Sequence, residues 1–150
     1  MIRIMTIDDY DALFKMWKNT PNMGLRSLDD SREGIERFLK RNPQTNFVAY
    51  GDGKLIGAIL SGHDGRRGYI YHTVVLPEYR RKGIGSVLVD TAVDSLRKEG
   101  ITRVCLNVME ANEAGKAFWL NRGWEKKSFL GFYSKAITDQ ENAPLFQEKA

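Results

Sequence analysis

A strand-like segment, a basic turn and a helix-like segment follow one another between residues 69 and 99 of the chain. Residues 69–76 read YIYHTVVL, and such β-branched and aromatic residues are typical of a strand. The apolar residues that follow recur at the three- and four-residue spacing of a helix, at Ile84, Val87, Leu88, Ala92 and Leu96. A strand that leads directly into a helix indicates an α/β fold.

The turn between these segments, Arg80-Arg81-Lys82-Gly83-Ile84-Gly85, has the features of an anion site. Glycine lets the backbone approach a ligand closely, and the first N–H groups of a helix have no partner within the helix. The helix dipole favours negative charge at the same place. Together with three cationic side chains, the turn predicts a site for a phosphorylated ligand. Two other phosphate-binding motifs are excluded, because no lysine follows Gly85 and Leu88 replaces a third glycine.

Hydrophobic spacing and turn residues divide the rest of the chain into further elements. In order we expect a strand at 3–5, helices that begin after Thr6 and Asp30, a hairpin of 46–50 and 54–61, the strand at 69–76, a helix at 85–99, a strand at 102–108, a helix at 113–122, and strands near 124–128 and 130–137. This order is typical of a mixed α/β sheet with helices on both faces. The tail from residue 138 is polar, although its Leu145 and Phe146 are suited to dock on the body or on a partner.

The composition excludes several classes of protein. The 150 residues include 23 Lys or Arg and 19 Asp or Glu, and the excess charge of +4 lies in short clusters, so nucleic acid is not an expected partner. No apolar stretch suits a membrane span, and the N-terminus lacks the apolar region of a signal peptide. One cysteine and two histidines give no disulfide and no zinc-ligand spacing. We therefore expect no metal, no membrane and a cytoplasmic location.

A second motif, NEAGKAFW at residues 112–119, is followed by Gly123-Trp124. Together with Arg80-x-x-Gly83-x-Gly85, this motif resembles the GNAT superfamily of acetyltransferases, and the resemblance covers residues 1–137. It implies an α/β fold with a mixed, mostly antiparallel twisted sheet of about six to seven strands, flanked by about four helices. Residues 1–137 would form one domain, and residues 138–150 a C-terminal tail.

The resemblance implies acetyl-CoA as the cofactor, bound where strands 69–76 and 102–108 splay apart. The pantetheine arm would pair with the backbone of the first strand, and the pyrophosphate would meet the amides of residues 81–86. The residues implied for cofactor binding are Val74, Val75 and Leu76 on the strand, Arg80, Arg81, Lys82, Gly83, Ile84, Gly85 and Ser86 at the turn, and Asn112 and Trp119 in the second motif.

The familiar catalytic residues of the superfamily are absent at the matching positions. Trp119 stands where the commonest general acid, a tyrosine, is found, and an indole N–H cannot protonate a thiolate near neutral pH. Asn107 stands where other members have a glutamate base, and it cannot ionise. In several relatives the general base projects from the positions that match 69 or 71. The resemblance therefore makes Tyr71 and Tyr69 the candidate catalytic residues.

Strand alternation predicts on which face of the sheet these side chains lie. With a period of two, one face is expected to hold Tyr69, Tyr71, Thr73 and Val75, and the other Ile70, His72 and Val74. His72 has the chemistry of a base, but alternation places it on the face opposite the two tyrosines.

These features predict an acetyl-CoA-dependent N-acetyltransferase that acts on a primary amine by direct attack in a ternary complex. The acceptor stays open between a peptide or protein N-terminus, a lysine and a small amine, and the resemblance places it against residues 19–29 and 128–133. The missing acid and base leave a second interpretation, a non-catalytic acyl-CoA-binding or regulatory module. The chain is expected to be a monomer or a homodimer.

Overall fold

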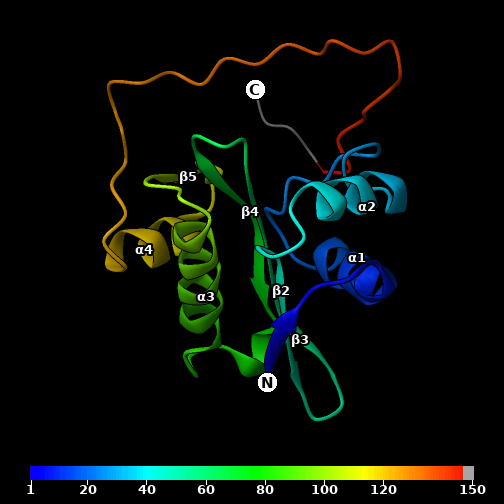
Figure 1. Ribbon diagram of the computed structural model, residues 1–150, viewed down its shortest axis with the longest axis vertical. Helices are drawn as coiled ribbons and strands as arrows, with labels where there is room; N and C mark the ends of the chain where they lie inside the picture. Colours follow the sequence, from blue (N-terminus) through cyan, green and yellow to red (C-terminus); the bar gives the residue numbers. More distant parts are fainter. Residues whose placement is uncertain (147–150) are drawn as a thin grey trace.

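The computed structural model describes residues 1–146, in which five strands and four α-helices alternate with two short 3₁₀ helices (Figure 1). The elements are β1 (Ile2–Ile4), η1 (Ile7–Asp9), α1 (Tyr10–Lys18), α2 (Arg32–Arg41), β2 (Phe47–Gly51), β3 (Lys54–His63), β4 (Gly68–Val75), η2 (Pro77–Tyr79), α3 (Ile84–Lys98), β5 (Val104–Leu106) and α4 (Glu113–Asn121). Within residues 1–146, no helix is both long and apolar enough to cross a membrane.

The strands form one sheet in the order β1-β2-β3-β4-β5, in which β5 runs parallel to β4 and all other neighbours are antiparallel. The α/β class, the mostly antiparallel sheet and the four helices confirm the prediction, but six to seven strands are more than the five observed. Residues 124–128 and 130–137, expected to be strands, form none. A strand needs backbone partners on a neighbour, and these segments pair with no strand within residues 1–146.

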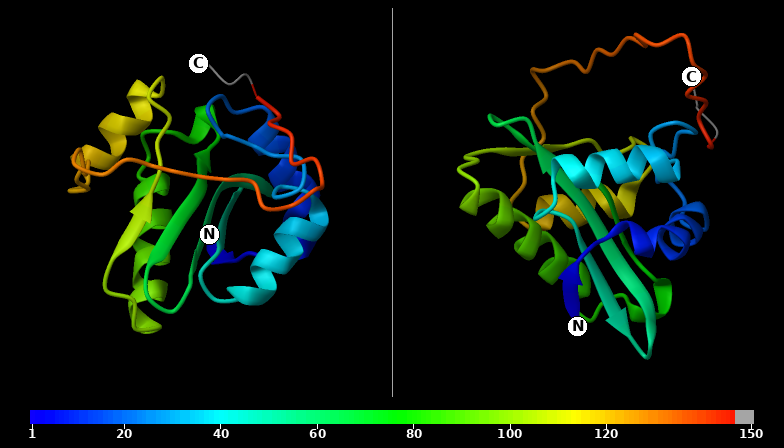
Figure 2. Two further views of the ribbon diagram at one scale, coloured as in Figure 1. Left: turned by 90° about the horizontal axis from the view of Figure 1, so that it is seen from above. Right: turned by 45° about the vertical axis from the view of Figure 1, so that its right-hand side comes forward.

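Helices cover both faces of the sheet, as predicted. The helices α1 and α2 pack on one face, where Trp17 is fully buried, and α3 packs on the other, where Leu88 is fully buried. The views in Figure 2 show the sheet between these two layers, with α4 on the side of α3. Two of the helices begin at capping side chains: the hydroxyl of Ser31 accepts from the N–H of Gly34 in α2, and Asn112 caps α4 in the same way.

A β-bulge interrupts β4 near its middle. Ile59 of β3 pairs with Thr73, but Ser61 pairs with Ile70, so that two residues of β4, Tyr71 and His72, oppose the single residue between them on β3. An extra residue reverses the alternation of side chains beyond it. Beyond the bulge, each side chain of β4 therefore points to the face opposite to the one that strict alternation predicts.

The prediction of strict alternation along β4 is thus wrong. Ile70 belongs to the core on the α3 side, whereas Val74 belongs to the core on the α1 side, although both were expected on one face. Tyr71 contacts Phe38 of α2, and His72 contacts Trp17 of α1. His72 and the two tyrosines therefore share the α1–α2 face of the sheet.

Residues 125–141, here called the arm, leave α4 and cross over the top of the molecule in extended form (Figures 1 and 2). Every residue of the arm is exposed. The chain then returns to the body: Pro144 forms an antiparallel bridge with Arg26, and Asn142 Oδ1 accepts from the N–H of Leu28 at 2.9 Å. Residues 142–146 thus dock on the loop between α1 and α2, while residues 147–150 of the tail lie outside the described residues.

Candidate functional site

The turn before α3 presents unpaired backbone N–H groups. Arg81 and Gly83 have positive φ angles of 63° and 81°, which turn the chain sharply into the helix. No side chain caps α3, in contrast to α2 and α4, and no acceptor within residues 1–146 meets the N–H groups of Ile84, Gly85 or Ser86. A Cβ on Gly83 would meet nothing within 4 Å. The space and the free donors fit a phosphate group.

Cationic side chains surround this turn, and the sequence analysis missed one of them. Arg80 Nε donates to the carbonyl of Val75 at 2.9 Å, and Lys82 lies over the ring of Tyr79. Arg122, at the end of α4, donates to Ser86 Oγ at 2.6 Å and to a carboxylate of α3, while its Nε is buried without a partner. No local motif marks Arg122, because only the packing of α4 on α3 brings it to the turn.

The edge of β4 that faces β5 is unpaired over most of its length. The two strands pair only as far as Ile70 and Leu106, and residues 71–75 of β4 continue without a strand partner on that side, where the carbonyl of Val75 accepts from Arg80 Nε. The N–H of Leu76 donates to Ile56 of β3, so alternation directs the backbone of Val75 toward the open side. The open edge measures about 17 Å at 3.3 Å per residue, enough for an extended pantetheine arm. It runs from the end of the β4–β5 pairing to the start of α3.

The two candidate tyrosines lie where β4 and β5 part. Tyr69 and Tyr71 contact each other with ring centroids 5.1 Å apart. Burial raises the pKa of Tyr69, and a hydrogen bond with Asn107 beyond β5 opposes the rise only in part. Burial also raises the pKa of Tyr71, with smaller contributions from Tyr69 and Asp29. Both phenols therefore stay protonated near neutral pH and are suited to donate a proton rather than to accept one.

His72 forms a buried pair with Asp30 on the same face of the sheet. Its Nε2 lies 2.6 Å from Asp30 Oδ1, and both side chains are about nine-tenths buried, with 11% and 7% exposed. Asp30 Oδ2 accepts from the N–H of Arg26, and the His72 ring meets the edge of Trp17 at 4.9 Å between centroids. A neutral ring that donates its Nε2–H to this carboxylate has Nδ1 as its acceptor. Strict alternation predicts His72 on the face opposite the two tyrosines. Only the bulge in the structure shows that all three side chains share one face.

The second motif has a clear structural role. Asn112 Oδ1 accepts from the N–H of Gly115, which leaves the side-chain NH₂ of Asn112 for other contacts. Trp119 packs edge-on against Phe118 and Trp124 within the core on the α3 side. Phe118 in turn approaches Gly85, where a Cβ would lie 3.5 Å from its ring. The motif therefore fixes α4 against the phosphate turn.

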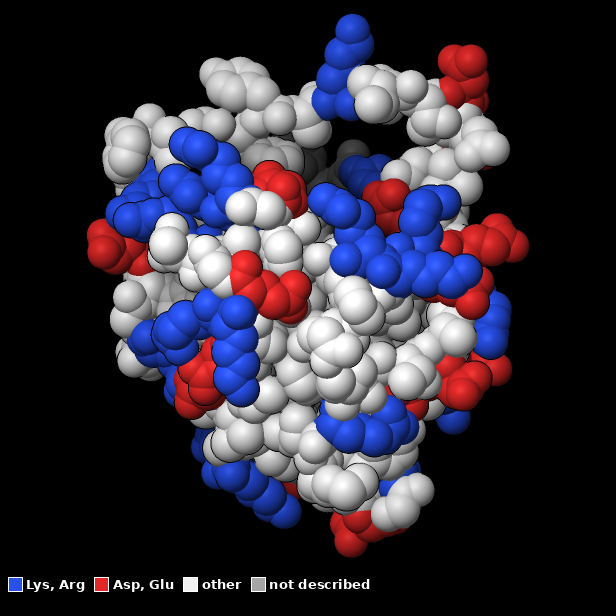
Figure 3. Space-filling view, viewed as in Figure 1, with Lys and Arg blue, Asp and Glu red and all other residues white. Residues whose placement is uncertain are grey.

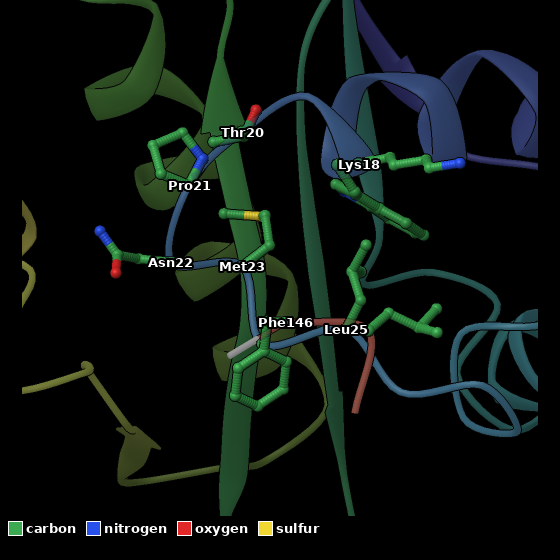
Figure 4. A pocket seen from close by; sticks show the side chains of 10 residues that line it. Lys18, Thr20, Pro21, Asn22, Met23, Leu25 and Phe146 are labelled. Carbon is green, nitrogen blue, oxygen red and sulfur yellow. The ribbon is translucent and has the colours of Figure 1, made fainter. Parts of the chain in front are cut away.

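A pocket of about 210 Å³ opens beside the α1–α2 loop (Figure 4). Its walls come from the end of α1, from residues 20–25 of the loop and from Leu145 and Phe146 of the docked tail. Figure 4 shows that the ammonium of Lys18, the one charged residue of the lining, points away from the other side chains. The pocket adjoins the open edge of β4 on two sides, since Trp17 of its wall contacts His72 and Gly24 lies close to Met109 beyond β5.

The surface charge is distributed in patches. On the face drawn in Figure 3, Lys and Arg side chains form several separate clusters, and Asp or Glu side chains lie beside most of them. The same view shows the arm arched over an opening at the top of the molecule. The positive charge on this face is therefore divided into local clusters rather than one continuous basic surface.

Comparisons with known proteins agree with this geometry. The model of the acetyltransferase (GNAT) family matches residues 10–124. An acetyltransferase of Pectobacterium atrosepticum is 30% identical over 93% of this chain and 98% of its own length. Among solved structures, Ard1 from Thermoplasma volcanium superposes with a TM-score of 0.72 at 20% identity, over 82% of this chain and 80% of its own. The PaiA N-acetyltransferase of Thermoplasma acidophilum, solved with coenzyme A, superposes with a TM-score of 0.70 at 22% identity, over 81% of this chain and 87% of its own.

Proposed function

The chain belongs to the acetyltransferase (GNAT) family, and we propose that it is an acetyl-CoA-dependent N-acetyltransferase that transfers the acetyl group to a primary amine. The amine attacks the thioester directly while both substrates are bound. One observation carries the proposal: the uncapped, positively charged start of α3 lies at one end of the open edge of β4, and two phenols and a histidine lie at the other.

In this proposal the turn holds the phosphates of acetyl-CoA. The free N–H groups of Ile84, Gly85 and Ser86 bind the pyrophosphate, and Arg122 adds positive charge from α4. The N–H of Val75 donates to the pantetheine arm along the open edge of β4, since its carbonyl already accepts from Arg80. Bound acetyl-CoA supplies an activated acyl carbonyl and a thiolate leaving group, and its thioester then reaches the end of the edge near Tyr71.

His72 takes the proton of the attacking amine. An ammonium has no lone pair and cannot attack, so a group near the thioester must take its proton before the new C–N bond forms. His72 Nδ1 is suited to this, because Asp30 holds the other ring nitrogen at 2.6 Å and stabilises the imidazolium that results. Asp30 is a positioning residue in this scheme.

Tyr71 and Tyr69 act on the leaving sulfur. As the C–S bond breaks, the thiolate gains negative charge that a phenol can stabilise by donating a hydrogen bond. Burial raises the pKa of both phenols, so they remain protonated donors throughout the neutral range. This role replaces the expected base function of the two tyrosines, and it makes an acid at Trp119 unnecessary.

The acceptor occupies the pocket beside the α1–α2 loop. The pocket lining includes no Asp or Glu and combines Trp17, Met23, Leu25 and Phe146. Such a lining favours an amine that is joined to an apolar group over a polycation, which would need carboxylates. A peptide N-terminus with an apolar first residue and a small arylalkyl- or alkylamine fit this description best.

Two measurements test the proposal. Titration calorimetry should detect acetyl-CoA binding, and absence of heat and of thermal stabilisation at millimolar cofactor would refute the site. Release of free thiol should then be measured against a panel of peptides, lysine derivatives and small amines, with hydrolysis as the baseline. Turnover above that baseline supports the enzyme, whereas binding without turnover across the whole panel supports a non-catalytic acyl-CoA-binding module, a possibility to which Trp119 and Asn107 point.

A further inference from the structure

Residues 142–146, here called the strap, are tied to the α1–α2 loop by backbone hydrogen bonds. The N–H of Leu145 donates to the carbonyl of Leu25 at 2.8 Å, and the N–H of Ser27 donates to the carbonyl of Ala143 at 2.9 Å. The hydroxyl of Ser27 also accepts from the N–H of Ala143 at 2.8 Å. Chain termini are loose unless they are tied down in this way, so the strap has a defined place on the loop.

Asn142 holds the start of the strap with both ends of its side-chain amide. Its Oδ1 accepts from the N–H groups of Leu28 at 2.9 Å and Asp29 at 3.3 Å, and its Nδ2 donates to Asp29 Oδ2 at 3.0 Å. An amide carries both an acceptor and a donor, whereas an aspartate at this position would set a second carboxylate against Asp29. The contact therefore depends on the type of residue at position 142.

The strap supplies one wall of the pocket that we propose for the acceptor. Leu145 and Phe146 line this pocket together with residues of α1 and of the loop, and in the view of Figure 4 Phe146 lies at the end away from Thr20. Leu145 is 50% exposed, so an apolar ligand would gain free energy by covering it. The guanidinium of Arg26 lies over the ring of Phe146, 5.9 Å from its centroid, which favours this position of the ring. The size of the apolar group that fits therefore depends on the strap.

The loop under the strap also carries Asp30, the partner of the proposed base. The N–H of Asp30 donates to the carbonyl of Arg26 at 3.0 Å, and Asp30 Oδ2 accepts from the N–H of Arg26 at 2.7 Å. Asp30 Oδ1 in turn lies 2.6 Å from His72 Nε2. The strap is bonded to residues 25–29, directly before Asp30, so it holds the turn that directs this carboxylate to the histidine.

We propose that the strap is a functional part of the active site. Leu145 and Phe146 determine which apolar group of an amine the pocket accepts, and Asn142 is a positioning residue that keeps Asp30 against the base. The strap lies outside residues 10–124, which the family model matches, so this role belongs to a segment particular to this chain. The inference rests on the proposed function, because it takes the pocket as the acceptor site.

Two probe amines test the specificity role: 2-phenylethylamine, which carries an apolar ring, and ethylamine, which lacks it. The ratio of their kcat/KM values with acetyl-CoA should fall about 10-fold in Phe146→Ala and less in Leu145→Ala, because part of the wall that covers the ring is lost. The Kd for acetyl-CoA should stay unchanged. Gln140→Ala, at an exposed position just before the strap, is the control and should keep the wild-type ratio. A ratio that Phe146→Ala leaves within about twofold of the wild type overturns the specificity role.

The same amines separate this inference from the reaction itself. Calorimetric titration of each amine into the protein saturated with coenzyme A gives the preference as a ratio of Kd values, without chemistry. If the wild type binds 2-phenylethylamine but acetylates no amine, the proposed reaction and the positioning role fail together, and the change of the Kd ratio in Phe146→Ala decides the specificity role. If the wild type does not bind 2-phenylethylamine, the inference fails, whereas acetyl transfer to another amine of the panel would leave the proposed function intact.

An exchange of two residues tests the positioning role. Asn142→Asp should loosen the strap, because two carboxylates would then meet where an amide now donates to Asp29. It should lower kcat on both amines by about 10-fold and speed hydrogen–deuterium exchange of the amides at residues 25–30. Asn142→Asp combined with Asp29→Asn restores one amide and one carboxylate, and it should recover both measurements. Faster exchange with an unchanged kcat would mean that the strap has a structural role only, and no response of either measurement would mean that Asn142 does not hold it. Either result overturns the positioning role.

Discussion

Gly83→Asp tests the phosphate site most directly, because the structure separates its effect on binding from its effect on folding. A Cβ at this position meets nothing within 4 Å, so the new side chain causes no clash. Gly83 has a φ of 81°, and Asp and Asn tolerate this left-handed conformation better than other residues. We expect the free energy of unfolding of the unliganded protein to fall by about 1 kcal/mol at most.

The effect on acetyl-CoA is expected to be much larger. The new carboxylate stands beside the free N–H groups of α3, where a phosphate would bind. Two unit charges 4 Å apart repel by about 1 kcal/mol in water and by about 4 kcal/mol at the effective dielectric of a protein surface. Taking about 2–4 kcal/mol, and about 1.4 kcal/mol for each tenfold change, Gly83→Asp should raise the Kd for acetyl-CoA by about 30- to 1,000-fold.

Gly83→Asn is the matched control. It has the same shape and the same backbone preference as Gly83→Asp but no charge, so the ratio of the two Kd values isolates the electrostatic part. Calorimetric titrations at low and high salt should show this ratio shrinking as salt rises, because screening weakens the repulsion. Equal affinities of the folded Asp and Asn variants would refute the placement of the phosphates at this turn.

Four further variants probe the rest of the molecule. His72→Gln should lower kcat by about 10²- to 10⁴-fold with little change in the Kd for acetyl-CoA, and an unchanged kcat would exclude it as the base. Tyr71→Phe should reduce kcat less, about 10-fold for one lost hydrogen bond to the sulfur, with an unaltered melting temperature. Arg122→Met should weaken acetyl-CoA binding and reduce its salt dependence in calorimetry. Burial would raise the pKa of Asp9, but hydrogen bonds from Arg3, Thr6 and Tyr50 outweigh burial and lower that pKa. The ionised carboxylate therefore stabilises the fold above its unfolded pKa of about 4, and this stability is lost as the pH falls through the lower folded pKa. Arg3→Met should therefore cost about 2 kcal/mol in urea unfolding at pH 7 and progressively less in acid.

The sequence predicts the parts of the fold that local patterns determine. The run 69–76, the glycine turn and the apolar spacing from Ile84 each act within a few residues, and β4 and α3 lie where these patterns place them. The start of α2 is predicted almost as well, although its cap is Ser31 and not the neighbouring Asp30. The turn that we propose to bind phosphate could therefore be located without a structure.

Contacts between distant segments were beyond such patterns. His72 and Asp30 are 42 positions apart, and Arg122 and Ser86 are 36 apart, so only the packed fold reveals either pair. The strands expected after Trp124 show a different limit. Their composition does favour a strand, but a strand also requires an edge to pair with, and composition alone does not supply one.

The bulge explains why Tyr71, His72 and the open edge of β4 lie close together. Strict alternation would direct Tyr71 and His72 to opposite faces of the sheet, and one extra residue on β4 turns both toward α1 and α2. The same place is where β4 loses its pairing with β5, just beyond Ile70. A regular sheet would have neither the open backbone edge nor the side chains of His72 and Tyr71 on one face at its end. The two irregularities of β4 together make the site, while the regular residues 73–75, paired with β3, hold it rigid.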